Sequence, residues 1–364
     1  MSQRDQIITK AIQNDAVFVG DYLSSVKRSQ AEDFVPIVNL CLVNYLSLFV
    51  YEGFARLTEM GSSLSTSLSP IAKQVVARSR HSLKFFEDTK RGITGQLNYF
   101  ETEIIPAHKE EFLGNIWLRF ARHWETDLGL YRYSGRIIST THSATFALGV
   151  DPQTMFEEGA GPALRDIWAE FGQYFGALGA VIDSEIESFL DHVDATHFGG
   201  IGDDVRSEKF YASGFTGAQQ PSVNALLTVF MASLNFVNLI LPDSLHYSIF
   251  KIRYLTTYQI LRSLELLRAD STITLDARSM SFISAILDNQ NAQLITRSSA
   301  KPFRNTLMHY GPDSRIELDR LDENSLVESM TPLCFNGMKA SDLQSILECT
   351  LKHTAERINA WSGK

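Results

Sequence analysis

Cysteine is scarce in this chain, and several common catalytic motifs are absent from it. The 364 residues include only Cys41, Cys334 and Cys349, whose spacing is not that of a metal site. There is no Cys-x-x-Cys pair, no phosphate-binding Gly-rich loop, no dinucleotide fingerprint and no Ser-centred nucleophile elbow. These absences argue against a zinc module, a P-loop nucleotide hydrolase and an α/β serine hydrolase. The odd cysteine count fits a reducing compartment, so we expect a cytoplasmic protein.

The chain also lacks the net positive charge that favours binding to nucleic acids. Its formal net charge is -9, and from residue 221 onward 14 basic residues balance 14 acidic ones, so the acidity belongs to the first part. A whole-protein attraction to nucleic acid is therefore not supported. A local attraction remains open, because the window between Asp288 and Asp313 has no acidic residue and contains Arg297, Lys301 and Arg304.

No cleavable leader is predicted, since Arg4, Asp5 and Lys10 interrupt the first residues. Residues 34–51 and 223–242 lack charge and are long enough to cross a bilayer. Both contain asparagines, whose amides are costly in hydrocarbon, and both continue into polar segments. We predict that they are buried helices of a soluble protein that has no membrane contact.

Apolar residues recur at helical spacing along most of the chain, which predicts an all-α fold. The apolar content of 44% and the charged content of 21% are near average for folded proteins, so we expect a sizeable core. The predicted helices cover approximately residues 5–30, 36–60, 70 onward, 110–128, 162–193, 222–241, 245–268, 275–296 and 341–360.

Local signals refine these boundaries. Ser69 before Pro70 predicts a cap, Thr274 is predicted to cap the helix that follows it, and Ser341 with Gln344 forms a capping box. A break is expected near residues 176–179, where glycines cluster. Between residues 131 and 150 the helical pattern fails, and β-branched residues favour a short strand pair or an irregular loop.

The clearest domain boundary is the glycine-rich stretch at residues 196–221, which we interpret as a long loop. The chain then divides into three parts. They are a helical domain of unknown role at residues 1–200, a loop or linker at 201–221, and a second helical domain at 222–364.

The string RNTLMH at residues 304–309 is the main candidate for chemistry. Arg304 can hold a phosphate through two hydrogen bonds, and His309 can exchange a proton near neutral pH. On a helix, Asn305 and His309 share a face. Pro302 marks the helix start, where free N–H groups favour an anion. The string therefore predicts a phosphate site with one titratable group. The alternative is that Arg304 and His309 are ordinary surface or packing residues.

This string resembles the signature of HEPN domains, the helical nucleotide-binding and ribonuclease domains of prokaryotic toxins and antiviral systems. Their motif is an arginine, usually followed by a polar residue, and then a histidine after a spacer of about four to six residues. Here the spacer is four residues and begins with Asn305. The context is similar too, because two long helices and a connector precede the motif and a closing helix follows. The resemblance covers roughly residues 222–361 and makes the second predicted domain HEPN-like.

The resemblance implies a homodimer in which two motifs face one cleft and cleave RNA without a metal or any other cofactor. The 2′-hydroxyl would attack the adjacent phosphate, His309 would exchange protons, Arg304 would stabilise the phosphorane, and Asn305 would support them. Many members with the motif are inactive. The alternative is therefore a non-catalytic scaffold that dimerises or binds a partner or nucleotide.

The predicted role is that of a toxin or antiviral-defence endoribonuclease whose substrate is RNA. Arg297, Lys301 and Tyr310, which lie close to the motif in the sequence, are predicted to bind the substrate. An antitoxin or a sensor is the partner that such a role implies.

A second candidate site contains His192, Asp194 and His197 beside Asp203 and Asp204. These side-chain types bind transition metals, so a metal-dependent enzyme that uses residues 192–204 is a second alternative function. The other interpretation is a polar helix end that runs into a solvated loop.

A third candidate is the weaker Arg–His pattern of Arg119, Arg122 and His123, which has aromatic residues interleaved. We interpret this stretch mainly as an amphipathic core helix with a basic outer face. A degenerate copy of the motif or an RNA-stacking surface is the alternative, and stacking requires exposed rings.

Overall fold

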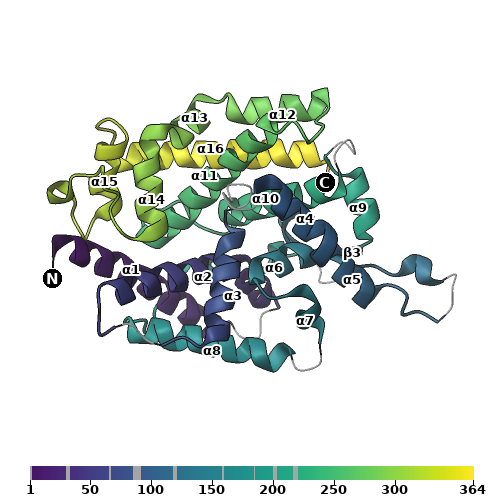
Figure 1. The fold of residues 1–364 in the computed structure, drawn as a ribbon, viewed down its shortest axis with the longest axis horizontal. Helices are drawn as coiled ribbons and strands as arrows, with labels where there is room; N and C mark the ends of the chain where they lie inside the picture. The colour runs from purple at the N-terminus through teal and green to yellow at the C-terminus, as the bar shows by residue number, and fades with distance from the viewer. Residues whose placement is uncertain are drawn as a thin grey trace.

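The computed structural model describes residues 2–29, 33–64, 67–84, 92–117, 121–157, 160–183, 185–199, 203–215 and 220–364. Most of these residues are helical (Figure 1). The first half contains α1 (Gln3–Arg28), α2 (Val35–Glu59), α3 (Pro70–Ser82), α4 (Gly92–Tyr99), α5 (Ile105–Phe112), α6 (Thr141–Leu148), α7 (Pro152–Phe156) and α8 (Ala160–Ala177). The second half contains α9 (Ser207–Ser213), α10 (Pro221–Leu239), α11 (Tyr247–Ala269), α12 (Ala277–Leu287), α13 (Gln290–Thr296), α14 (Lys301–His309), α15 (Leu326–Cys334) and α16 (Ala340–Ser362).

A small antiparallel sheet corrects the predicted all-α class to a mostly helical one. Its strands are β1 (Leu128–Tyr133), β2 (Arg136–Thr140) and β3 (Asp203–Val205), in the order β2-β1-β3. The strand pair predicted within residues 131–150 is found as β1 and β2, but the expected loss of helix there is only partly right, because α6 occupies residues 141–148. The stretch 196–221 is only partly the predicted loop, because β3 pairs with β1 and α9 follows it.

The helices predicted at residues 5–30, 36–60, 222–241, 245–268 and 341–360 are confirmed as α1, α2, α10, α11 and α16. Two of the three predicted caps are wrong. Ser69 does cap α3, because its hydroxyl accepts the N–H of Ala72 at 3.1 Å. Thr274 does not cap α12, since the Asp276 carboxylate takes that position two residues later and accepts the N–H of Ser279 at 2.7 Å. At α16 the N-cap is Lys339, which makes no side-chain cap, so no capping box forms there.

The predicted helix at 110–128 is wrong, and the helix predicted at 162–193 is too long. After α5 ends, the Glu125 carboxylate accepts the backbone N–H groups of Gly114 at 2.8 Å and Ile116 at 2.7 Å. These side-chain hydrogen bonds replace the helical ones. The helix α8 ends at Ala177, close to the predicted break, and Gly179 then has a positive φ of 99°. The asparagine at position 289 likewise separates α12 from α13 by capping the second of them.

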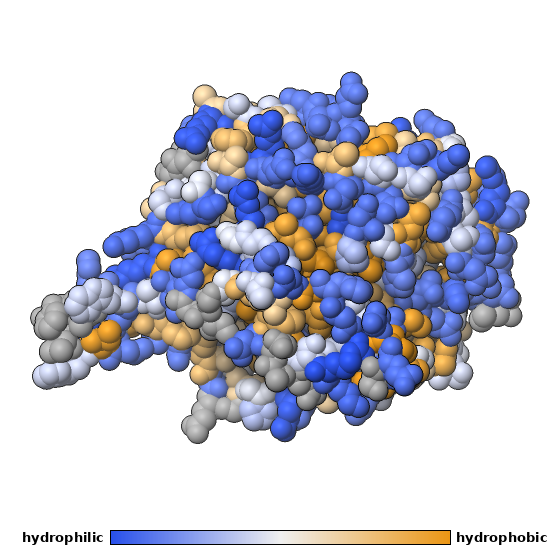
Figure 2. Space-filling model, turned by 180° about the vertical axis from the view of Figure 1, so that it is seen from behind, coloured by the Kyte–Doolittle hydropathy of each residue, from blue (hydrophilic) through white to orange (hydrophobic). Residues whose placement is uncertain are grey.

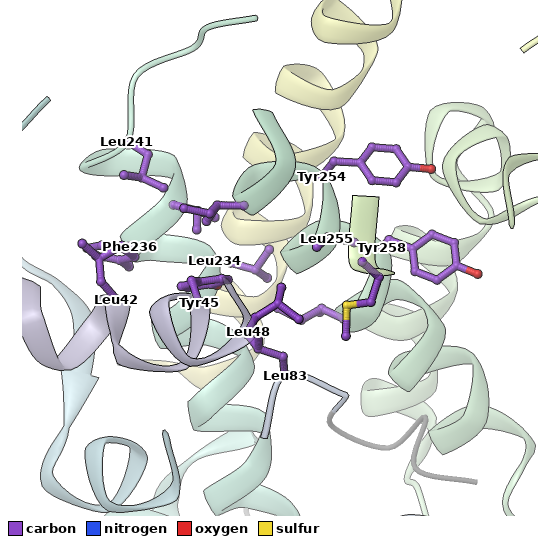
Figure 3. Close-up of a cluster of buried hydrophobic side chains, with 14 of the residues drawn as sticks. Leu42, Tyr45, Leu48, Leu83, Leu234, Phe236, Leu241, Tyr254, Leu255 and Tyr258 are labelled. Atoms are coloured by element: carbon purple, nitrogen blue, oxygen red, sulfur yellow. The ribbon is translucent and has the colours of Figure 1, made fainter. Parts of the chain in front are cut away.

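The two halves of the chain share one hydrophobic core. The C-terminal helices form one layer over α1, α2, α3 and α8 in Figure 1. Side chains of α2, such as Leu42, lie beside Phe236 of α10 in Figure 3, and the hydroxyls of Tyr45 in α2 and Thr256 in α11 are 2.6 Å apart. The division into residues 1–200, 201–221 and 222–364 stays a prediction, and the core residues on both sides of it belong to one cluster.

The helices α2 and α10 are long and apolar enough to cross a membrane by length and composition. In the structure, 72% of the most apolar window of α2 and 83% of that of α10 are buried. Such burial is typical of core helices. The apolar surface of α10 is hidden within one chain, so it gives no reason to expect a dimer. The cytoplasmic location stays a prediction.

Two buried histidines make stability depend on pH. The rings of His108 and His142 are 4.4 Å apart, and they contact the hydroxyls of Thr145 and Tyr211, each at 2.9 Å. Burial lowers the pKa of His108 to about 4 and that of His142 well below its ordinary value. In the unfolded chain a histidine titrates near ~6.5. The unfolded state therefore takes up more protons below that pH, and stability falls as pH falls.

We expect the free energy of unfolding to decrease between about pH 6.5 and pH 4, by roughly 3 kcal/mol for His108 alone. Urea unfolding at several pH values in this window measures the decrease. A His108→Gln variant should flatten the dependence. An equally steep dependence in that variant would show that other groups cause it.

Candidate functional site

The helix α14 carries the Arg–His string. It begins at Lys301 with Pro302 in its first turn and ends before Tyr310, which has a left-handed φ of 58°. Leu307 is 0% exposed and Met308 is 1% exposed, so both side chains lie in the core. The remaining side chains of the string therefore lie toward neighbouring helices or solvent.

His309 pairs with a buried carboxylate of α2. Its Nδ1 lies 2.9 Å from Oε2 of Glu52, whose other oxygen accepts a hydrogen bond from Arg80 of α3. Burial by itself raises the pKa of Glu52, but the hydrogen bond from His309 and the charge of Arg80 lower it overall. The Glu52 carboxylate is 7% exposed, whereas the His309 side chain is 32% exposed. An ionised carboxylate thus orients an imidazole that solvent can reach.

Two further arginines meet at the same end of α14. The Nε of Arg56 donates to the backbone carbonyl of His309 at 2.9 Å, and its Nη1 pairs with Glu59 at 2.6 Å. A Cβ added to Gly311 would lie 3.3 Å from Nη2 of Arg4 and 3.5 Å from the guanidinium of Arg56. Two guanidinium groups therefore lie at the His309 end of α14, and guanidinium is a group suited to binding a phosphate.

Arg304 lies on a different side of α14 from His309. A separation of five residues rotates a helical position by about 140°. Arg304 is 9% exposed, its guanidinium lies over the ring of Tyr258 in α11 at 5.5 Å, and its Nη1 donates to Asn305 at 3.2 Å. Asn305 in turn donates to Asp313 at 3.0 Å. Asn305 thus links Arg304 to a loop carboxylate, while His309 is bound to α2.

The residues predicted to bind substrate occupy three different environments. Lys301 is exposed, and Arg297 is partly buried with its guanidinium 5.4 Å from the ring centre of Phe335. Tyr310 is 0% exposed, and its hydroxyl donates to Asp15 of α1 at 2.5 Å. The ring of Tyr310 therefore lies in the core, and its predicted contact with a substrate stays a prediction.

A buried ionic cluster holds the end of α14. Besides Tyr310, Asp15 accepts hydrogen bonds from Lys251 at 2.7 Å and Ser248 at 2.6 Å, both in α11. The Lys251 ammonium also lies 3.8 Å from the ring centre of Tyr310. Burial lowers the pKa of Lys251, and the neighbouring Asp15 opposes that shift. The cluster ties α1, α11 and the residue after His309 together.

No sequence pattern predicted that Glu52, Arg80, Arg56 or the Asp15–Lys251 pair would lie at this site. Glu52 and Arg56 lie more than 200 residues from His309, and Lys251 lies 236 residues from Asp15. Arg80 lies 28 residues from its partner Glu52, on a different helix. One signal was available, since charged residues inside long apolar helices are rarely buried without a partner. The partner itself can be named only when the fold is known.

The candidate metal residues do not form a cluster. Asp194 caps a short turn by accepting from Thr196, and it lies 3.8 Å from His197. Asp203 pairs with Arg132 at 2.7 Å. Within the described ranges of the chain, which omit residues 200–202, there is no group of three or more His, Cys, Asp or Glu side chains that could hold a metal ion.

The third candidate lies on an arm that projects from the body, between α5 and β1 (Figure 2). The prediction of a core helix there is wrong, because Trp117 is 88% exposed and Trp124 is 72% exposed. Arg122 donates to the carbonyl of Ile116 at 2.9 Å, and Arg119 lies outside the described residues. The exposed rings meet the requirement for stacking on RNA, which stays an alternative.

Comparisons with known proteins give no relative. No protein-family model matches the chain, and no curated protein or solved structure matches it. The resemblance to HEPN domains therefore rests on the string at residues 304–309 and its helical context.

Proposed function

We propose that the protein is a metal-independent RNA endonuclease in which His309 exchanges protons. The observation that carries this proposal is the 2.9 Å contact between Nδ1 of His309 and Glu52. A buried carboxylate that orients a partly exposed imidazole is a common arrangement for general acid–base catalysis, because it fixes the ring and leaves Nε2 for the substrate.

The proposed reaction forms a bond between the 2′ oxygen and phosphorus and breaks the bond from phosphorus to the 5′ oxygen. The products are a 2′,3′-cyclic phosphate and a 5′-hydroxyl. The imidazole of His309 takes the proton of the 2′-hydroxyl and returns it to solvent, and the departing 5′ oxygen takes a proton from solvent. Arg4 and Arg56, which lie at the same end of α14, supply positive charge for the phosphorane. The homodimer with a composite cleft belongs to this proposal through the resemblance alone.

Cleavage of single-stranded RNA in excess EDTA tests this proposal. We expect cleavage to continue in the chelator and to yield cyclic phosphate ends, because His309 and the arginines need no metal. The measurement is gel separation of end-labelled RNA, with end analysis by phosphatase sensitivity. Cleavage that EDTA abolishes would instead support a metal-dependent enzyme and overturn the proposal.

A non-catalytic helical scaffold is the second candidate, and the position of Arg304 favours it. The guanidinium is mostly buried over Tyr258, where it acts in packing α14 against α11. A well-folded protein that cleaves no RNA would support this function. The toxin or antiviral role, with its antitoxin or sensor partner, stays a prediction under either candidate.

A further inference from the structure

A cavity of about 450 Å³ lies between α1, α2 and α8, far from the string at residues 304–309 in the sequence. In Figure 1, α8 runs beside α1 and α2, and the end of α6 completes the wall. Pockets that hold small molecules typically measure ~300–1,000 Å³. This cavity is therefore large enough for an organic molecule.

The walls of the cavity contain no charged side chain. Aromatic rings of α8 form one side, including Trp168, Phe171 and Phe175. Phe171 and Phe175 are 2% and 3% exposed, so they are packed in the core while they line one side of the cavity. A charged ligand would lose its hydration here without gaining a partner, so the lining selects against charge.

One polar pair interrupts the apolar lining. The hydroxyl of Tyr22, which is 0% exposed, donates to Oδ1 of Asn39 at 2.5 Å. The Tyr22 oxygen retains acceptor capacity, and the Asn39 amide can both donate and accept. Ligand sites commonly combine an apolar lining with a few polar groups that fix the orientation of the ligand.

We propose that this cavity binds an uncharged, largely apolar small molecule that carries one hydrogen-bonding group. The apolar part lies against the rings of α8, and the polar group bonds to the exposed amide of Asn39, which the buried Tyr22 hydroxyl orients. This ligand site is independent of the proposed ribonuclease activity.

Gly172 offers a direct way to close the cavity. It lies in the wall, within α8, and a Cβ there would meet no heavy atom within 4 Å. A leucine at this position can therefore enter the open space without displacing the core, and it also favours the helix. Gly176 is the matched control, since it lies one turn later in α8 and is equally open but does not line the cavity.

The probe is N-phenyl-1-naphthylamine, which is uncharged, has one N–H group and becomes fluorescent in apolar sites. Its sulfonated analogue, 8-anilinonaphthalene-1-sulfonate, has the same rings and a negative charge. We expect the full chain to bind the neutral probe at least ten times more tightly than the sulfonate. Gly172→Leu should weaken binding of the neutral probe at least tenfold, whereas Gly176→Leu should leave it unchanged. Tyr22→Phe should weaken it about fivefold, through loss of one hydrogen bond.

Several outcomes would overturn the proposal. These are no binding of the neutral probe, equal binding of both probes, and equal binding to Gly172→Leu and Gly176→Leu. Thermal unfolding of both leucine variants shows whether they are folded. If the wild-type chain is a dimer and Gly172→Leu is a monomer in sedimentation, the occupant is a second copy of the chain, and the small-molecule assignment is wrong.

Discussion

The His309→Ala variant is expected to cleave RNA ~10²–10⁴-fold more slowly than the wild-type protein, since a positioned proton-exchanging group contributes that much to the rate. Folding should survive, because the His309 side chain is 32% exposed and Glu52 keeps its ion pair with Arg80. The measurement is the single-turnover rate in EDTA, with circular dichroism to verify the fold.

His353→Ala is the matched control, because His353 is partly exposed on α16. Among the hydrogen bonds of the described residues, its side chain contacts only the carbonyl of Ala285, at 3.1 Å. This control should cleave at the wild-type rate. Full activity in a folded His309→Ala protein would remove the catalytic assignment. If both histidine variants lose activity equally, a general fold defect is the cause.

Variants of Arg304 test whether this residue takes part in cleavage, as the resemblance to HEPN domains implies. If it does, Arg304→Ala removes activity and Arg304→Lys restores little of it, since an ammonium lacks the planar two-point contact. Asn305→Ala should be milder, as a typical hydrogen bond contributes about 0.5–1.5 kcal/mol. If Arg304 only packs over Tyr258, its loss lowers stability and leaves the cleavage rate of the folded fraction unchanged.

The Lys251→Met variant is expected to lose about 3–5 kcal/mol of unfolding free energy, because it leaves a buried carboxylate without its counter-ion. Lys251 is 0% exposed and Asp15 is 1% exposed, so water cannot replace the lost ammonium. Ser248 and Tyr310 would still donate to Asp15, but neither neutralises its charge. Urea unfolding at neutral pH measures the loss.

The double variant Asp15→Asn with Lys251→Met tests whether the unpaired charge of Asp15 causes the loss of stability. An asparagine carries no charge and keeps one acceptor oxygen, so one of the Ser248 and Tyr310 hydroxyls can still donate to it while the other accepts from its NH2 group. The double variant should therefore be more stable than Lys251→Met alone. Lys352→Met on the exposed face of α16 should change stability by no more than about 0.5 kcal/mol. A Lys251→Met protein within about 1 kcal/mol of wild type would show that the pair is not a net source of stability.

The sequence determined the long helices of this protein, because their signals are local. The apolar runs that became α2 and α10 are long enough to be identified without any partner, and the cap at Ser69 acts within one turn. The helix predicted at residues 110–128 was wrong because non-local contacts decide the structure there. Its helical pattern was overridden by the Glu125 carboxylate, which binds two backbone N–H groups about ten residues earlier in the chain.

The same contrast holds for the site. The sequence identified Arg304 and His309 as one string, because a motif is a local pattern. Only the tertiary structure decided that His309 meets Glu52 while Arg304 faces Tyr258, since helix rotation and packing separate them. It also placed Tyr310 in the core, where its hydroxyl donates to the carboxylate of Asp15, near the other end of the chain. Contacts between residues so far apart in sequence depend on how the helices pack, and no local pattern records that.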